Sequence, residues 1–408
     1  MGRLSLPINQ VVSPLPRKIV QQQQRCIATD ILNYMRIRSL VVLVTLALVG
    51  TSCSSSSTSG GDPNAKTPAE AYITPGPYSV GITTLTLDRG PEVEVWYPAA
   101  EKSDATDTYD IRDFTPEAIR ALLTGDAPAT FTVDATRDAK GADKKFPVVL
   151  FSHGASGVRV QSSFLTAHLA SWGIVVVAPD HWSRDLPRAL VGQTVGTSAD
   201  TPADLFDALD LALATDSLKD MLDVDNIAIV GHSAGGGTAL LASSDERVDG
   251  YVSMASGDLR SDAASEMPNK PSFFIAGSLD QIVTVADRTR PAFEKAPSPS
   301  LLWVIDEVGH NGFDDFCTFG NGTGIIGVAE ASGLGPLLAG NPSLRRLGED
   351  GCVPPAADVT KAFPIIRHAV TAWLLNLFGI DEKPLGLLPE TEGLSDAYEL
   401  KVSVIEAK

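Results

Sequence analysis

Short apolar runs alternate with helical segments through the middle of the chain, and this alternation limits the fold more than any other feature of the sequence. Continuous apolar runs bounded by turn residues suit strands that are buried on both faces of a parallel sheet. Strands that alternate with helices predict an α/β fold, in which right-handed crossovers join a mostly parallel central sheet flanked by helices. The predicted strands span residues 146–151, 174–178, 227–230, 272–276 and 301–305, and the predicted helices span about 161–171, 203–221, 234–242 and 285–294.

Other segments frame this central pattern. Residues 80–87 and 92–97 alternate between apolar and polar and are rich in β-branched side chains, which predicts a hairpin of half-buried strands. Residues 115–123 predict a short helix and residues 362–377 a closing amphipathic helix, whereas the sequence after Asp381 predicts no particular structure. We therefore divide the chain into an N-terminal extension with a signal peptide (1–52), a low-complexity tether (53–70), a folded domain (71–380) and a C-terminal tail (381–408).

The N-terminal region predicts export. An apolar run at residues 39–49 follows Arg36 and Arg38 and precedes small residues, which is the arrangement of a secretory signal. The run is too short for an ordinary membrane span. Because Met35 begins a well-formed signal by itself, we expect translation to start there rather than at Met1.

A cysteine follows the apolar run directly. Cys53 precedes a Ser- and Gly-rich stretch, and this order resembles a bacterial lipoprotein signal. The resemblance implies that Cys53 carries a lipid and anchors the chain to a membrane. Gly50 stands where that family usually has Leu, so secretion without lipidation is the alternative.

Charge and cysteine content exclude some classes of function. The chain carries 32 Lys and Arg against 50 Asp and Glu, with a formal net charge of -18 and no basic cluster, so we expect no nucleic-acid partner.

Cys26 and Cys53 belong to the N-terminal region, which leaves Cys317 and Cys352 to form one disulfide in an exported domain. Two separate buried thiols are the alternative. No spacing of Cys or His indicates zinc, and we expect no metal.

One motif carries chemistry. Residues 231–236 read G-H-S-A-G-G and stand between a predicted strand and a predicted helix. This G-x-S-x-G context is typical of a nucleophile elbow, in which a serine occupies a sharp, strained turn and small neighbours let the strand and helix approach each other. A phosphate-binding loop is the alternative, but it requires a Lys that does not follow these glycines. The pattern predicts Ser233 as a nucleophile.

A serine nucleophile needs a base and an acid, which follow it in the chain order Ser, Asp or Glu, His. Only His310 and His368 come after the serine. His310 follows the predicted strand 301–305 in a loop, whereas His368 lies inside a predicted helix, so His310 is the predicted base. Asp280 follows the predicted strand 272–276 and is the predicted acid, with Asp258 as the alternative.

Two backbone N–H groups are predicted to stabilise an oxyanion. One belongs to Ala234, the residue after the nucleophile, and the other to Ala155, in the Gly-containing loop 152–157 after a predicted strand. A plain glycine turn is the alternative for this loop. His153 is predicted to support the loop by hydrogen bonding, beside the substrate pocket.

Five stretches together resemble a known group of enzymes. They read F-P-V-V-L-F-S-H-G-A-S-G, L-A-S-W-G-I-V-V-V-A-P-D-H, G-H-S-A-G-G-G-T-A-L, I-A-G-S-L-D-Q-I-V and G-H-N-G-F. This set resembles the bacterial relatives of platelet-activating-factor acetylhydrolase and is similar to the cutinase-like polyesterases. Over residues 78–379 the resemblance implies the α/β-hydrolase fold, no cofactor, a Ser233–His310–Asp280 triad, and oxyanion donors at Ala155 and Ala234.

The chain also departs from the polyesterases. The polyesterases usually have an aromatic residue where this chain has Ala155, and Met where it has Ala234. Both differences weigh against polyester substrates. The segment 310–354 is longer than in cutinase-like enzymes, and a disulfide would hold this insertion beside the base. Phe313, Phe316 and residues 325–338 are then predicted to form part of a lid or acyl pocket, with a surface loop as the alternative. Residues 182–199 are a second predicted cap, in which Trp182 lines the pocket.

These observations predict a carboxylic ester hydrolase that acts through an acyl-enzyme on short- to medium-chain esters of small molecules or lipids. A phospholipid acetylhydrolase, a lipase and a polyesterase are alternatives with the same chemistry. A catalytically silent, ligand-binding lipoprotein is the alternative of another class. The sequence leaves the oligomeric state open.

Overall fold

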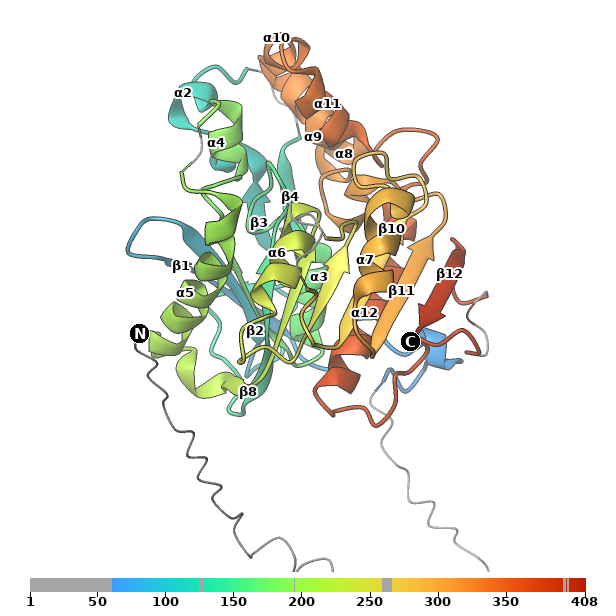
Figure 1. Ribbon diagram of the computed structural model, residues 1–408. Coiled ribbons are helices and arrows are strands. Elements are labelled where there is room, and N and C mark those ends of the chain that lie inside the picture. Colours follow the sequence, from blue (N-terminus) through green and yellow to red (C-terminus); the bar gives the residue numbers. More distant parts are fainter. Residues whose placement is uncertain (1–60, 125–127, 194, 259–265, 392–393, 395) are drawn as a thin grey trace, which may run out of the picture. The chain divides into compact units, whose positions relative to one another are not determined.

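A ten-stranded sheet runs through the chain and sets the positions of all other elements (Figure 1). Its strand order is β12-β11-β10-β9-β8-β6-β7-β2-β1-β5. Neighbouring strands from β11 through β7 pair in parallel, and β2 and β12 join antiparallel at the two sides of this central block. The predicted mostly parallel α/β sheet is therefore confirmed.

The computed structural model describes residues 61–408 except 125–127, 194, 259–265, 392–393 and 395. The described residues belong to one compact unit that spans Thr58–Lys408. The predicted signal peptide, the start at Met35 and the lipidated Cys53 lie outside the described residues. Among those that are described, no helix combines the length and the apolar character that a membrane span needs.

Each apolar run predicted to form a strand lies in one, and the predicted hairpin is also present. The hairpin pairs β1 with β2, antiparallel from Val80↔Pro98 to Thr86↔Glu92. The strands of the main sheet are β1 (Val80–Thr86), β2 (Glu92–Pro98), β5 (Thr136–Arg137), β6 (Phe146–Ser152), β7 (Val175–Pro179), β8 (Leu222–His232), β9 (Gly250–Met254), β10 (Ser272–Gly277), β11 (Ser300–Ile305) and β12 (Val402–Ala407). A separate pair is formed by β3 (Asp107–Asp110) and β4 (Thr130–Val133).

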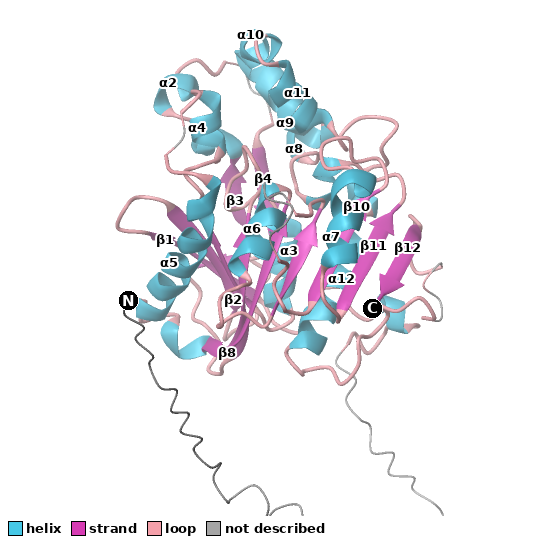
Figure 2. Cartoon of the chain, in the orientation of Figure 1, coloured by secondary structure: helices cyan, strands magenta, loops and turns pink. Residues whose placement is uncertain are grey.

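Strand β6 shows why its sequence is apolar without a break. Val149 and Phe151 belong to the hydrophobic cluster on one face of the sheet, and Val148 and Leu150 to the cluster on the other. Successive side chains of a strand point to opposite faces, so a strand between two helical layers must be apolar at every position. Helices cover both faces in this way (Figure 2). One cluster includes α3 (Ser163–Ser171) and α12 (Phe363–Leu377), and the other α5 (Thr201–Ala214), α6 (Ala234–Ala242) and α7 (Arg290–Lys295).

Three predicted elements differ in extent. The predicted helix 203–221 begins at Thr201 and ends at Ala214, because Thr215 takes an extended conformation. The predicted helix 285–294 is a π-helical turn, Val285–Thr289, followed by α7 (Arg290–Lys295). Proline near the start of α7 has no N–H to donate, which fits a change of helix type at this point. The helix predicted at 115–123 is the single turn α2 (Glu117–Arg120).

The insertion after the predicted base folds into short helices. It contains α8 (Phe319–Gly322), α9 (Gly324–Ala329), α10 (Gly335–Ala339) and α11 (Pro342–Glu349). The predicted disulfide between Cys317 and Cys352 is present and closes this segment. In Figure 1 these helices lie beyond the carboxyl ends of the parallel strands, on the same side as α2 and α4 (Leu186–Leu190).

The C-terminal residues, for which the sequence predicts no particular structure, contribute a strand of the sheet. β12 pairs with β11 from Leu301↔Ala407 to Val304↔Val404. The peptide groups of Ser300 and Lys408 exchange two further hydrogen bonds. The strand therefore covers a sheet edge that would otherwise present unpaired N–H and C=O groups.

Deletion of residues 401–408 is expected to lower stability and solubility, because it uncovers the edge of β11. A loss of about 2 kcal/mol corresponds to a fall in Tm of about 3 °C for a unit that spans Thr58–Lys408. Differential scanning fluorimetry and light scattering measure both effects. Ser403→Ala, which leaves the backbone pairing intact, is the control. Equal melting and equal aggregation of the deleted and full-length chains would contradict the role given to β12.

Candidate active site

Ser233 occupies a turn that only a particular set of neighbours permits. It follows β8, precedes α6 and has φ 56° and ψ -124°, a strained conformation for a residue other than glycine. A Cβ at position 231 would stand 2.1 Å from the carbonyl oxygen of Gly235, and a Cβ at position 235 would stand 1.9 Å from that of Ser152. Both flanking positions therefore require glycine, which is the physical content of the G-x-S-x-G pattern.

The structure brings Ser233, His310 and Asp280 together from three strand ends. His310 Nε2 lies 2.8 Å from Ser233 Oγ, and His310 Nδ1 lies 2.8 Å from Asp280 Oδ2. All three residues are buried. A carboxylate on Nδ1 places the imidazole proton there and leaves Nε2 to accept the proton of the serine hydroxyl. The alternative base His368 is buried in α12, where its Nδ1 accepts from the backbone N–H of Tyr72 at 3.4 Å.

Backbone N–H groups orient the acid. Asp280 Oδ1 accepts from the N–H of Ile282 at 2.8 Å and from that of Val283 at 2.7 Å. These bonds occupy one carboxylate oxygen and leave Oδ2 for His310. Charge-assisted hydrogen bonds of this type are stronger than neutral ones, so the loop after β10 fixes the direction of the carboxylate.

Both predicted oxyanion donors lie beside Ser233. Ala234 is the first residue of α6, where an N–H has no partner within the helix. Ala155 follows β6 in the loop 152–157 and borders the chamber above Ser233. Within the described part of the chain, no hydrogen-bond acceptor is found for the backbone N–H of either alanine. Two free donors beside a serine Oγ are what a developing oxyanion requires.

Gln161 and His232 connect the loop 152–157 to the loop that carries His310. No sequence pattern predicts a role for either residue. Gln161 Oε1 accepts from the N–H of Gly154 at 3.3 Å, and its Nε2 lies 3.0 Å from His232 Nδ1. His232 Nε2 lies 3.0 Å from the carbonyl oxygen of His310. Burial lowers the pKa of His232 well below its usual value, so the ring is neutral, accepts at Nδ1 and donates from Nε2.

Asp350, in the insertion, holds the loops of both the base and the acid. Its Oδ1 accepts from the backbone N–H of His310 at 2.7 Å, and its Oδ2 from that of Gln281 at 3.1 Å. Its carbonyl oxygen accepts from the N–H of Asn311 at 2.9 Å. Because Cys352 is two residues away and bonded to Cys317, the disulfide ties this carboxylate to the start of the insertion.

An apolar chamber opens above Ser233, with a cavity volume of about 90 Å³. Gly154, Ala155, His310 and Ser233 itself form its floor. The insertion supplies much of the wall, and α4 supplies another part. The apolar lining residues are Ile111, Leu123, Leu186, Leu190, Phe316, Ile325, Ile326, Val328, Ala329, Leu334, Leu338, Leu344 and Leu347.

Asp314 is the unusual member of the lining. It is buried, its Oδ1 accepts from the N–H of Phe316 at 2.9 Å, and its Oδ2 lies 3.5 Å from His232 Nδ1. Burial raises the pKa of Asp314 well above its usual value, which favours the neutral form of the carboxyl group.

Three residues predicted to line the pocket do not border this chamber. Phe313 is fully buried beneath it, with its ring centroid 6.3 Å from that of His232. Trp182 instead contacts the guanidinium of Arg188, whose central carbon lies 3.9 Å from the ring centroid in a cation–π contact. His153 is fully buried and does support the loop, because its Nδ1 lies 2.8 Å from the carbonyl oxygen of Gly154. In the described residues there is no cluster of three side chains suited to a metal.

Comparisons with known proteins give one consistent result. A family model described as chlorophyllase matches residues 125–248, and one described as platelet-activating factor acetylhydrolase, isoform II, matches residues 194–325. The second range contains Ser233, Asp280 and His310. Platelet-activating factor acetylhydrolase from Canis lupus familiaris is 25% identical over 307 residues, which cover 60% of this chain and 68% of that protein. Cutinase 1 from Thermobifida cellulosilytica is 27% identical over 160 residues, which cover 38% of this chain and 55% of the cutinase.

A solved structure supports the fold. A ferulic acid esterase from Streptomyces cinnamoneus superposes with a TM-score of 0.59 at 20% identity and covers 81% of this chain and 98% of its own. The predicted α/β-hydrolase fold and the resemblance to acetylhydrolases and cutinases are confirmed.

Gly235→Ala is expected to disrupt the turn that carries Ser233, because the new methyl group would overlap the carbonyl oxygen of Ser152. We expect a fall in Tm and a loss of esterase activity, measured by scanning fluorimetry and a p-nitrophenyl acetate assay. Gly340→Ala is the matched control, since a Cβ there would meet only ordinary contacts at 3.5 Å or more. A Gly235→Ala protein with wild-type melting and rate would show that the steric argument is wrong.

Asp350→Ala is expected to lower kcat/KM by about 10- to 100-fold. Losses of this size are typical when a residue that orients the groups of a site by hydrogen bonding is removed. The variant leaves two N–H groups of the catalytic loops without their acceptor. Glu349→Ala is the control, because Glu349 pairs with Arg345 instead. Steady-state kinetics on the folded variant measure this effect. A change of less than about twofold in kcat/KM would contradict the role of Asp350 in orienting the catalytic loops.

Proposed function

Since the chain is a serine carboxylic ester hydrolase with the α/β-hydrolase fold, we propose that Ser233, His310 and Asp280 perform a two-step acyl transfer. Ser233 Oγ attacks the ester carbonyl while His310 Nε2 accepts the hydroxyl proton. Asp280 keeps the imidazole in the required tautomer and stabilises the imidazolium. The N–H groups of Ala155 and Ala234 bind the oxyanion.

The first step ends when His310 donates the proton to the leaving alcohol, and the acyl group stays on Ser233 as an ester. The second step hydrolyses this ester and returns the enzyme to its starting state. Water then loses a proton to His310 and attacks the acyl carbonyl, and the carboxylic acid leaves as Ser233 recovers its proton. The observation that carries this proposal is the continuous hydrogen-bonded series from Asp280 through His310 to Ser233, with both bonds at 2.8 Å.

The chamber favours esters with a short acyl group. Its cavity volume of about 90 Å³ is smaller than that of the apolar cavity of about 150 Å³ that holds a benzene molecule. An acetyl to butyryl group suits this space, whereas a longer chain must extend through the opening of the chamber. We therefore propose short- to medium-chain esters as substrates. The small side chain of Ala155 leaves no aromatic clamp for a polyester at this position.

A phospholipid ester is the second candidate substrate. The similarity to platelet-activating factor acetylhydrolases favours it, since it covers 60% of the chain in the canine relative and 62% in the relative from Cavia porcellus. A substrate of this class would place a short acyl group in the chamber and its remaining apolar part at the opening. Assays on a phospholipid with a short acyl chain, beside p-nitrophenyl esters, distinguish the two classes.

We also propose that the protein is exported. The disulfide between Cys317 and Cys352 supports this, because disulfides persist in oxidising compartments. Lipid attachment at Cys53 stays a proposal that rests on the sequence. Mass spectrometry of the N-terminal peptide from the producing cell tests it, and an unmodified peptide that begins elsewhere would contradict it.

The triad is tested with residues 54–408, which contain the whole compact unit. Wild type is expected to hydrolyse p-nitrophenyl acetate and butyrate faster than the palmitate. Ser233→Ala is expected to lower turnover by about four to six orders of magnitude. Ser243→Ala is the control, because this buried serine only donates to the carbonyl oxygen of Ala239. Equal rates for wild type and Ser233→Ala, with both folded, would contradict the mechanism.

A further inference from the structure

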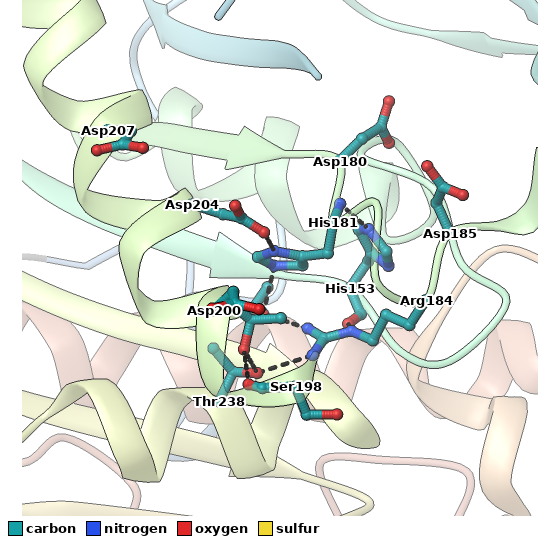
Figure 3. Close-up of polar contacts among 12 residues, drawn as sticks. His153, Asp180, His181, Arg184, Asp185, Ser198, Asp200, Asp204, Asp207 and Thr238 are labelled. Atoms are coloured by element: carbon teal, nitrogen blue, oxygen red, sulfur yellow. Dashed lines mark hydrogen bonds and ion pairs between the residues drawn. The ribbon is translucent and has the colours of Figure 1, made fainter. Parts of the chain in front are cut away.

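We propose that Arg184 is a positioning residue that holds the loop 152–157, and with it the oxyanion donor Ala155, through a buried relay of Ser152, His181 and Asp204. Figure 3 shows Arg184, His181 and Asp204 of this relay. This inference rests on the proposed function, since it concerns the same oxyanion site. None of these four residues touches the chamber or the triad.

The guanidinium of Arg184 contacts both the loop and the helix that follows the nucleophile. Its Nη2 donates to Ser152 Oγ at 2.7 Å and its Nε to the carbonyl oxygen of His153 at 3.1 Å. Its Nη1 donates to Thr238 Oγ1, on α6, at 2.9 Å. The carbonyl oxygen of Arg184 accepts from the N–H of Ser156 at 2.7 Å. These contacts hold the loop on both sides of Ala155.

The relay fixes the direction in which Ser152 donates. Ser152 Oγ lies 2.8 Å from His181 Nε2, and His181 Nδ1 lies 2.8 Å from Asp204 Oδ2. Burial lowers the pKa of His181 well below its usual value, so the ring is neutral and carries one proton. With that proton on Nδ1 facing Asp204, Nε2 accepts from the Ser152 hydroxyl, whose oxygen accepts from Arg184. Each donor then has one acceptor, and the series has a single orientation.

Hydrogen bonds also fix the peptide group that carries the Ala155 N–H. The carbonyl oxygen of this peptide belongs to Gly154, lies 2.8 Å from His153 Nδ1 and accepts from the N–H of Gly157 at 3.2 Å. His153 Nε2 in turn accepts from the backbone N–H of His181 at 2.9 Å. The peptide plane is therefore held through its carbonyl oxygen, which directs the N–H on its other side toward the site.

The relay repeats the Ser–His–acid order of the triad, but its surroundings differ. Ser152 and His181 are fully buried, and the Ser152 oxygen already accepts from Arg184. An ester therefore has no path to this serine. The arrangement orders the loop, and we assign it no covalent chemistry.

The cost of the arrangement supports a functional role. Arg184 is part-buried, and among the described residues it has no carboxylate within ion-pair distance; its hydrogen bonds reach Asp204 through Ser152 and His181. Burial lowers the pKa of Arg184 to about 9, so the group stays a protonated donor at neutral pH. A part-buried charge without a direct ionic partner loses hydration that no carboxylate replaces, and groups with shifted pKa values gather at functional sites.

The test compares Arg184→Met, Ser152→Ala and the control Arg367→Met in the chain from residue 54. Arg367 is also part-buried and donates to a main-chain carbonyl oxygen, that of Phe164, at a position away from the chamber. Active sites are first counted by titration with a fluorophosphonate. For Arg184→Met we expect kcat per titrated site on p-nitrophenyl acetate to fall by about 100-fold, as when an oxyanion donor is lost. KM is expected to change less than about threefold, because the donor acts mainly in the transition state.

A second readout separates positioning from general destabilisation. The affinity for an aryl trifluoromethyl ketone, which forms a tetrahedral oxyanion on the serine, should weaken by the same factor as kcat/KM. Ser152→Ala removes a single oxygen atom and carries the test if Arg184→Met does not fold; for it we expect about a 10-fold loss of kcat. A lower Tm with unchanged kcat per titrated site in these variants would overturn the positioning role alone. Failure of wild type itself to turn over esters would instead overturn the proposed function.

Discussion

The strained turn at Ser233 is the constraint on which the rest of the site depends. A serine at φ 56° can be held between a strand and a helix only if Gly231 and Gly235 let the two elements and the loop after β6 come into contact. That contact sets Ser152 against the start of α6 and so places the loop 152–157 beside the nucleophile. The same geometry leaves the N–H of Ala234 unpaired at the helix start.

Two polar clusters hold the loops that the sheet alone cannot order. On one side, Asp350 accepts from the backbone on both the base loop and the acid loop, and the disulfide at Cys352 secures it. On the other side, Arg184 and its relay hold the oxyanion loop. Both clusters act on backbone groups, so a rigid site is obtained from loops at the carboxyl ends of parallel strands. The insertion thus has two roles, since it also forms much of the apolar wall of the chamber.

The sequence predicts the parts of this site that depend on local pattern. Ser233, Asp280 and His310 each follow a short apolar strand, so strand order and chain order suffice to identify them. Asp350 and Arg184 could not be found in this way, because acids and arginines are common and their partners are distant in sequence or are main-chain atoms. Trp182 was predicted to line the pocket, and no pattern in the sequence indicates its contact with Arg188. β12 was missed because it is a half-exposed edge strand without a clear apolar pattern.

The central claim is that Ser233, and not the similarly hydrogen-bonded Ser152, is the nucleophile. The most direct measurement is to label the folded protein with a fluorophosphonate and locate the adduct by peptide mass spectrometry. We expect one adduct per chain on the peptide that contains Ser233, formed in parallel with the loss of esterase activity. An adduct on Ser152, or full activity after labelling of Ser233, would contradict it.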